Sequence, residues 1–131
     1  MERMSAARAA VDRYLHLINE RRYDEIASIF APDGLFLAPI GEEFRGREAI
    51  HGFYSAGLRV IAPAKVWASS AVAEGNVCVI EISAQLPGEE AGRTHTVVDH
   101  FTVDDAGLVT RMAVYLRPEE IANTRAVLGG A

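Results

Sequence analysis

Two periodicities of apolar residues divide the chain near residue 62. Before this point, apolar residues recur every three or four positions, which is typical of helices with one buried face. Ser5 has the side chain of a helix cap at the start of the first helix. The predicted helices cover about 5–21, a short segment from about 24, and about 47–58. The apolar stripe of the first helix holds Ala7, Val11, Tyr14, Leu15 and Ile18.

After residue 62, apolar and polar residues alternate, which predicts strands. The strands cover about 64–73, 77–86, 93–104 and 108–116, with turn residues between them. A further short strand is expected at 35–38, between a turn at 32–34 and a loop at 39–41, and a terminal helix from Pro118. We therefore predict one α+β domain over residues 1–131, in which the helices cover the concave face of an antiparallel meander.

Composition narrows the class of protein. Half of the 131 residues are hydrophobic and 24% are charged, as in ordinary soluble domains. The 18 acidic residues outnumber the 13 Lys and Arg, and the formal charge of −5 argues against a nucleic-acid partner. No segment approaches the roughly 20 apolar residues of a membrane span, and residues 1–4 lead into a helix pattern without the apolar core of a signal peptide. We expect a cytoplasmic protein.

Asp99 is the residue that departs most from its pattern. In a strand over 93–104 it shares a face with Val97, Phe101 and Val103. A buried carboxylate without a partner is costly, so the group either becomes protonated or finds a donor. A structural aspartate that bonds to a nearby donor and a functional one explain this pattern about equally well.

Two tyrosines fall on predicted buried faces, Tyr14 on the first helix and Tyr54 on the third. Buried tyrosine hydroxyls usually find a hydrogen-bond partner. A cluster of Tyr14, Tyr54 and Asp99 around an apolar cavity would offer several donors to an oxyanion. The acidic pairs 42–43 and 89–90 are expected to be solvated loop charges.

The remaining polar residues give weaker signals. His95 shares the face of Asp99 but lies near the start of its strand, and the other histidines have no partner at metal-ligand spacing. We expect no metal and no organic cofactor.

The order of several short motifs resembles the ketosteroid isomerase branch of the nuclear-transport-factor-2-like (SnoaL-like) superfamily. The motifs are Ala31-Pro32-Asp33, Pro39-Ile40-Gly41, the helix start Phe44-Arg45-Gly46-Arg47-Glu48-Ala49-Ile50, and Asp99-His100-Phe101. The resemblance extends from about Val11 to Leu116. It implies a cone in which helices pack on a curved, mostly antiparallel sheet.

The resemblance also implies roles for individual residues. Tyr14 matches the oxyanion-hole tyrosine, Asp99 the carboxylic acid kept neutral by apolar surroundings, and Tyr54 the tyrosine that supports the first one. The expected substrate pocket is more aliphatic than in those isomerases, which suggests a less flat ligand. Its walls are Phe53, Ile82, Leu86, Val97, Phe101, Met112 and Leu116.

One position departs from the family pattern. The catalytic base of those isomerases is an Asp directly before the Pro-x-Gly loop, and here that position is Ala38. Alanine cannot carry a proton between carbon atoms. Either the base lies elsewhere, the reaction needs none, or Ala38 is an engineered replacement.

Three functions remain open at this stage. The first is an isomerase or cyclase that acts on a hydrophobic, carbonyl-bearing compound such as a steroid or polyketide, with the oxyanion held by Tyr14 and Asp99. The second is a polyketide cyclase or epoxide-opening enzyme that uses Asp99 as acid or base. The third is a binding protein that has kept the pocket without the base. The resemblance also implies a homodimer through the outer face of the sheet, with Trp67, Glu81, Ser83 and Tyr115 as interface residues.

Overall fold

A six-stranded mixed sheet forms the frame of the molecule, with strand order β2-β1-β6-β5-β4-β3. The computed structural model describes residues 5–90 and 92–129. Residues 1–4, on which the expected lack of a signal peptide partly rests, lie outside this part. The strands are β1 (Phe30–Leu37), β2 (Glu43–Arg45), β3 (Lys65–Glu74), β4 (Val77–Gln85), β5 (His95–Val103) and β6 (Val109–Tyr115). The predicted meander β3 to β6 is confirmed, and β1 joins it parallel to β6.

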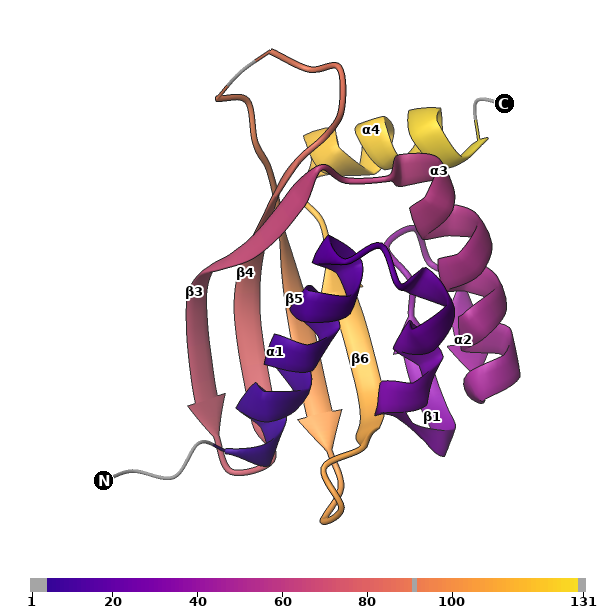
Figure 1. Ribbon diagram of the computed structural model, residues 1–131, viewed down its shortest axis with the longest axis vertical. Coiled ribbons are helices and arrows are strands. Elements are labelled where there is room, and N and C mark those ends of the chain that lie inside the picture. The colour runs from indigo at the N-terminus through magenta and orange to yellow at the C-terminus, as the bar shows by residue number, and fades with distance from the viewer. Residues whose placement is uncertain (1–4, 91, 130–131) are drawn as a thin grey trace.

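Helices cover one face of this curved sheet (Figure 1). Helix α1 packs on β3, β4 and β5, while α2 packs on β1 and β2 and α3 packs beside α4. The predicted α+β class is therefore confirmed. The helical elements are α1 (Ala6–Asn19), the 3₁₀ helix η1 (Tyr23–Ile29), α2 (Arg47–Phe53), the π-helical turn η2 (Tyr54–Leu58), α3 (Arg59–Ile61) and α4 (Pro118–Gly129). No helix in the described ranges is both long and apolar enough to cross a membrane.

The predicted turn at Pro32–Gly34 is wrong, because these residues lie inside β1. Phe30 pairs with Val109 and Leu35 with Arg111, so the segment between them bulges out of the ladder and the strand then continues. A Cβ atom at Gly34 would lie 3.0 Å from the carbonyl oxygen of Val109, which explains the glycine at this close approach. The three-residue strand β2 was not predicted, since it is too short to show a period.

The third predicted helix is longer than its pattern indicates. It passes from α2 through the π turn that begins at Tyr54, and then through α3. The left-handed conformation of Ala62, with φ of 42°, ends it. Single π turns inside helices are frequent at functional sites, and this one carries two side chains of the cavity described below, Tyr54 and Leu58.

The expected interface residues on the outer face of the sheet differ in exposure. Tyr115 is exposed, but Ser83 is buried and its hydroxyl lies within hydrogen-bond distance of those of Ser69 and Thr96. A homodimer through this face stays a prediction.

A side-chain amide ties the end of α1 to the free edge of the sheet. The amide of Asn19 donates to the carbonyl oxygen of Val66 at 2.9 Å and accepts from the backbone N–H of Val66 at 2.8 Å. Val66 pairs with Ala84 on its other side, so Asn19 takes the place of a neighbouring strand.

Replacement of Asn19 by alanine should therefore destabilise the protein. We expect a loss of about 1–2 kcal/mol in the free energy of unfolding, because two hydrogen bonds to a strand backbone are lost. Urea denaturation measures this, with the neighbouring Glu20→Ala as a control that should change stability by less than about 0.5 kcal/mol. Equal effects of the two substitutions would show that the hydrogen bonds between Asn19 and Val66 do not stabilise the protein.

Candidate active site

A cavity of about 180 Å³ lies between the helices and the concave face of the sheet. Most of its walls are apolar. The polar side chains in its lining are Tyr14, Tyr54, His95, Asp99, Glu120, Asn123 and Thr124. Binding cavities for small molecules commonly combine apolar walls with a few convergent polar groups.

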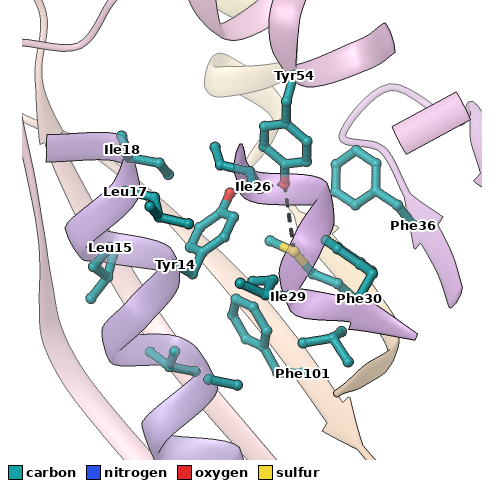
Figure 2. Close-up of a cluster of buried hydrophobic side chains, with 14 of the residues drawn as sticks. Tyr14, Leu15, Leu17, Ile18, Ile26, Ile29, Phe30, Phe36, Tyr54 and Phe101 are labelled. Carbon is teal, nitrogen blue, oxygen red and sulfur yellow. Dashed lines mark hydrogen bonds between the residues drawn. The ribbon is translucent and has the colours of Figure 1, made fainter. Parts of the chain in front are cut away.

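The two tyrosines form a buried hydroxyl chain. Their oxygens lie 2.9 Å apart, and the Tyr54 hydroxyl also lies 3.6 Å from the Met112 sulfur, to which it can donate (Figure 2). Burial raises the pKa of both hydroxyls far above their ordinary value, and the charge of Asp99 adds to this effect. Both groups are therefore neutral near pH 7, and each has one proton to donate.

Helix periodicity and aromatic packing position Tyr14. It lies on the buried stripe of α1, and its ring meets that of Phe101 on β5 edge to face, with 5.3 Å between the ring centroids. Figure 2 shows Tyr14 pointing from α1 toward Tyr54, which comes from the π turn on the opposite side. The hydroxyl chain therefore connects two helical segments that are 40 residues apart in sequence.

Asp99 lies on the cavity face of β5, as its strand pattern predicts. It pairs with Ile80 on β4 and with Val114 on β6, and only 2% of its surface is exposed. Its Oδ1 atom has no hydrogen-bond partner among the described residues. Burial raises the pKa of Asp99 to about 7, so the group carries a proton in a large fraction of molecules at neutral pH.

Most of the predicted site residues meet at this cavity. Besides Tyr14, Tyr54 and Asp99, its lining includes Phe53, Ile82, Leu86, Val97 and Leu116. Three other predicted residues are absent from the described lining. Phe101 and Met112 lie under the two tyrosines, where they support the rings and the Tyr54 hydroxyl. Ala38 is buried in a turn closed by its N–H to the carbonyl oxygen of Glu42, and the next residue, Pro39, lines the cavity.

A second polar group at the cavity was not predicted. The Nδ1 atom of His95 lies 2.9 Å from Oε2 of Glu120, and its Nε2 atom lies 2.7 Å from Oε1 of Glu89. Burial, the largest single cause, lowers the pKa of His95, but the hydrogen bonds to Glu89 and Glu120 and the charges of these carboxylates together outweigh it, and the net pKa is raised. The expectation that Glu89 is a solvated loop charge is wrong. The only sequence signal was that His95 shares a strand face with Asp99.

Both the sequence and the fold match known proteins. A sequence model described as SnoaL-like domain matches residues 11–112. A steroid Delta-isomerase of Nocardioides simplex is 31% identical over 127 residues, which cover 94% of this chain and all of that protein.

Solved structures show the same fold at lower sequence identity. RV0760c of Mycobacterium tuberculosis, in complex with estradiol-17beta-hemisuccinate, has a TM-score of 0.73 at 18% identity, with 88% of this chain and 97% of that chain covered. The epoxide hydrolase/cyclase-like enzyme SalBIII, which has a role in pyran ring formation in the polyether salinomycin, has a TM-score of 0.71 at 19% identity, with 86% and 92% covered.

The raised pKa of Asp99 predicts a specific dependence of stability on pH. Above pH 4 the unfolded chain loses the Asp99 proton while the folded protein keeps it, so this contribution to stability declines until the pH passes the folded pKa of about 7. The unfolding free energy of wild type relative to Asp99→Asn should therefore fall by about 4 kcal/mol between pH 4 and pH 8. Urea titrations at several pH values measure it.

The exposed Asp105 supplies the matched control, since Asp105→Asn should leave the slope of the wild type unchanged. A difference between wild type and Asp99→Asn that stays constant from pH 4 to pH 8 would show that Asp99 is not perturbed.

Proposed function

This chain belongs to the SnoaL-like domain family, in its ketosteroid isomerase-like branch, and we propose that it is an isomerase or cyclase of hydrophobic, carbonyl-bearing small molecules. The names of its relatives support an isomerase or cyclase type of function at the level of the family. One observation carries the proposal for this chain. The Asp99 carboxyl group, whose Oδ1 atom has no hydrogen-bond partner among the described residues, and the Tyr14 hydroxyl face the same apolar cavity.

In the proposed reaction, Tyr14 and neutral Asp99 donate hydrogen bonds to the carbonyl oxygen of the substrate. When a neighbouring carbon passes its proton to a basic group of the substrate itself, negative charge develops on the carbonyl oxygen. Donors that are already in place stabilise such charge strongly in a site that excludes water. The apolar neighbours of Asp99 keep its proton in place, so that it donates rather than accepts.

Tyr54 adjusts the direction of the hydroxyl chain. It has one proton, which can go either to the Met112 sulfur or to the Tyr14 oxygen. When the proton goes to sulfur, Tyr14 donates to Tyr54 and has none left for a ligand. A substrate oxygen reverses this order, so that Tyr54 donates to Tyr14 and Tyr14 donates to the substrate.

Ala38 limits which reaction the site can support. It provides no proton acceptor beside the cavity, and the carboxylates in the described lining are those of Asp99 and Glu120. The proposal therefore favours a substrate whose carbon–hydrogen bond is already weakened by its own carbonyl groups, as in polyketides. The aliphatic walls of the cavity fit a carbon skeleton that is less flat than an aromatic one.

Two other roles of the same residues give different results. If Asp99 is the base of a cyclase or of an epoxide-opening enzyme, it must be ionised to work. If the protein only binds its ligand, it holds carbonyl compounds through Tyr14 and Asp99 but converts none of them. The absence of a base at position 38 is the observation that favours the binding role.

Restoring the base is the first test. Ala38→Asp should raise the rate at which a β,γ-unsaturated 3-ketosteroid is converted to its conjugated isomer by at least about 10²-fold over wild type, because positioned acid–base groups contribute that much. Ultraviolet absorbance of the product measures the rate. Ala38→Asn is the matched control and should stay at the wild-type rate. An inactive Ala38→Asp variant that is folded and binds the steroid would contradict the proposed orientation of the substrate.

Removal of the donors is the second test, made in the Ala38→Asp background. Tyr14→Phe and Asp99→Leu should each lower kcat/KM by about 10²–10³-fold, as loss of one oxyanion donor does. Near-parental rates in both variants would rule out the proposed oxyanion site. The pH profile separates the roles of Asp99, since a neutral donor loses activity as the pH rises through about 7, and a base loses it as the pH falls.

A further inference from the structure

The cavity has a second polar end, built by β5 and the C-terminal helix. Glu120, Asn123 and Thr124 stand three and four positions apart on α4, so they share one face of that helix, and all three line the cavity. The carboxylate of Glu120 accepts from His95 and from the amide of Asn123. These contacts hold α4 against the start of β5.

The two polar ends lie far apart along one strand. His95 and Asp99 are four residues apart on the same face of β5, which corresponds to about 13 Å at about 3.3 Å per residue. The residue between them on this face is Val97, and its partner on β4 is Ile82; both line the cavity. A single ligand can therefore reach both ends only if it has a long apolar body.

The hydrogen-bonding groups of the outer end indicate which group it binds. Two carboxylates, Glu89 and Glu120, face the imidazole of His95, and Arg93 pairs with Glu89, so the charges of the cluster balance when His95 is protonated. Glu120 has a side chain that is only 15% exposed, and its carboxylate already accepts from His95 and Asn123. A carboxylate has about four lone-pair sites, so Glu120 can accept one more hydrogen bond, and a hydroxyl group of a ligand can donate it.

We propose that Glu120, Asn123 and Thr124 form an outer subsite that binds a hydroxyl group at the far end of an elongated apolar substrate whose carbonyl oxygen is bound by Tyr14 and Asp99. The inference rests on the proposed function, because the carbonyl group must be bound at the inner end for the hydroxyl group at the far end of the same ligand to reach the outer subsite. A second observation points to a ligand in this cavity, namely the buried Asp99 oxygen that has no partner among the described residues at the inner end.

A matched pair of steroids tests the subsite. Testosterone has a 3-carbonyl and a 17-hydroxyl group, and androst-4-en-3-one lacks only the hydroxyl. Isothermal titration should show that wild type binds testosterone about 10-fold more tightly, as expected for a hydrogen bond to a charged group. Glu120→Ala should reduce this ratio to about 2-fold or less. The ratio is the readout because a loosened α4 weakens both ligands alike.

The neighbouring Glu119→Ala is the control, since the Glu119 side chain is 56% exposed and pairs with Arg117. It should keep the 10-fold ratio.

Two results would overturn the subsite while the proposed function stands: equal binding of both steroids by wild type, or an unchanged ratio in Glu120→Ala. If neither steroid binds wild type, the subsite fails for a ligand of this length, and the proposed function is judged by the Ala38→Asp tests above.

Discussion

The exclusion of water from one carboxyl group is the constraint on which the site depends. Asp99 is surrounded by apolar side chains from three strands, and its Oδ1 atom has no hydrogen-bond donor among the described residues. In this environment the carboxyl group keeps its proton, so it can donate a hydrogen bond and not only accept one. The same burial keeps Tyr14 and Tyr54 neutral. A site with three neutral hydroxyl donors in an apolar cavity is suited to an oxygen that gains charge.

The fold brings these donors together from distant parts of the chain. The meander supplies Asp99 at the centre of the sheet, and α1 packs on this sheet and contributes Tyr14. The π turn contributes Tyr54, which points toward Tyr14 from the opposite side of the site (Figure 2). The C-terminal helix then closes the outer end through the contact of Glu120 with His95. Because each element contributes a side chain to one cavity, the position of the proposed oxyanion site and the proposed length of the ligand both follow from the spacing along β5.

Periodicity predicted the parts of the fold that repeat. The meander strands and the placement of Asp99 followed from alternation, and the buried side of α1 followed from its helical stripe. The prediction failed at residues 32–34, where residues typical of turns form a bulge inside β1. The turn preference of these residues does not show whether the chain reverses direction or only leaves the hydrogen-bond ladder with β6 for a few residues. Periodicity also missed the cluster of His95, Glu89 and Glu120, since contacts between a strand, a loop and a terminal helix leave no period in the sequence.

The central claim is that Asp99 is a neutral donor near pH 7. Its most direct test is a pH titration of the Asp99 side-chain carboxyl carbon by ¹³C NMR between pH 3 and pH 9, with the Asp99→Asn spectrum to assign the signal. An apparent pKa near 7 agrees with the burial of this group. An apparent pKa of about 4 or below would show an ordinary or stabilised carboxylate, and the oxyanion site described above would then lose one of its donors.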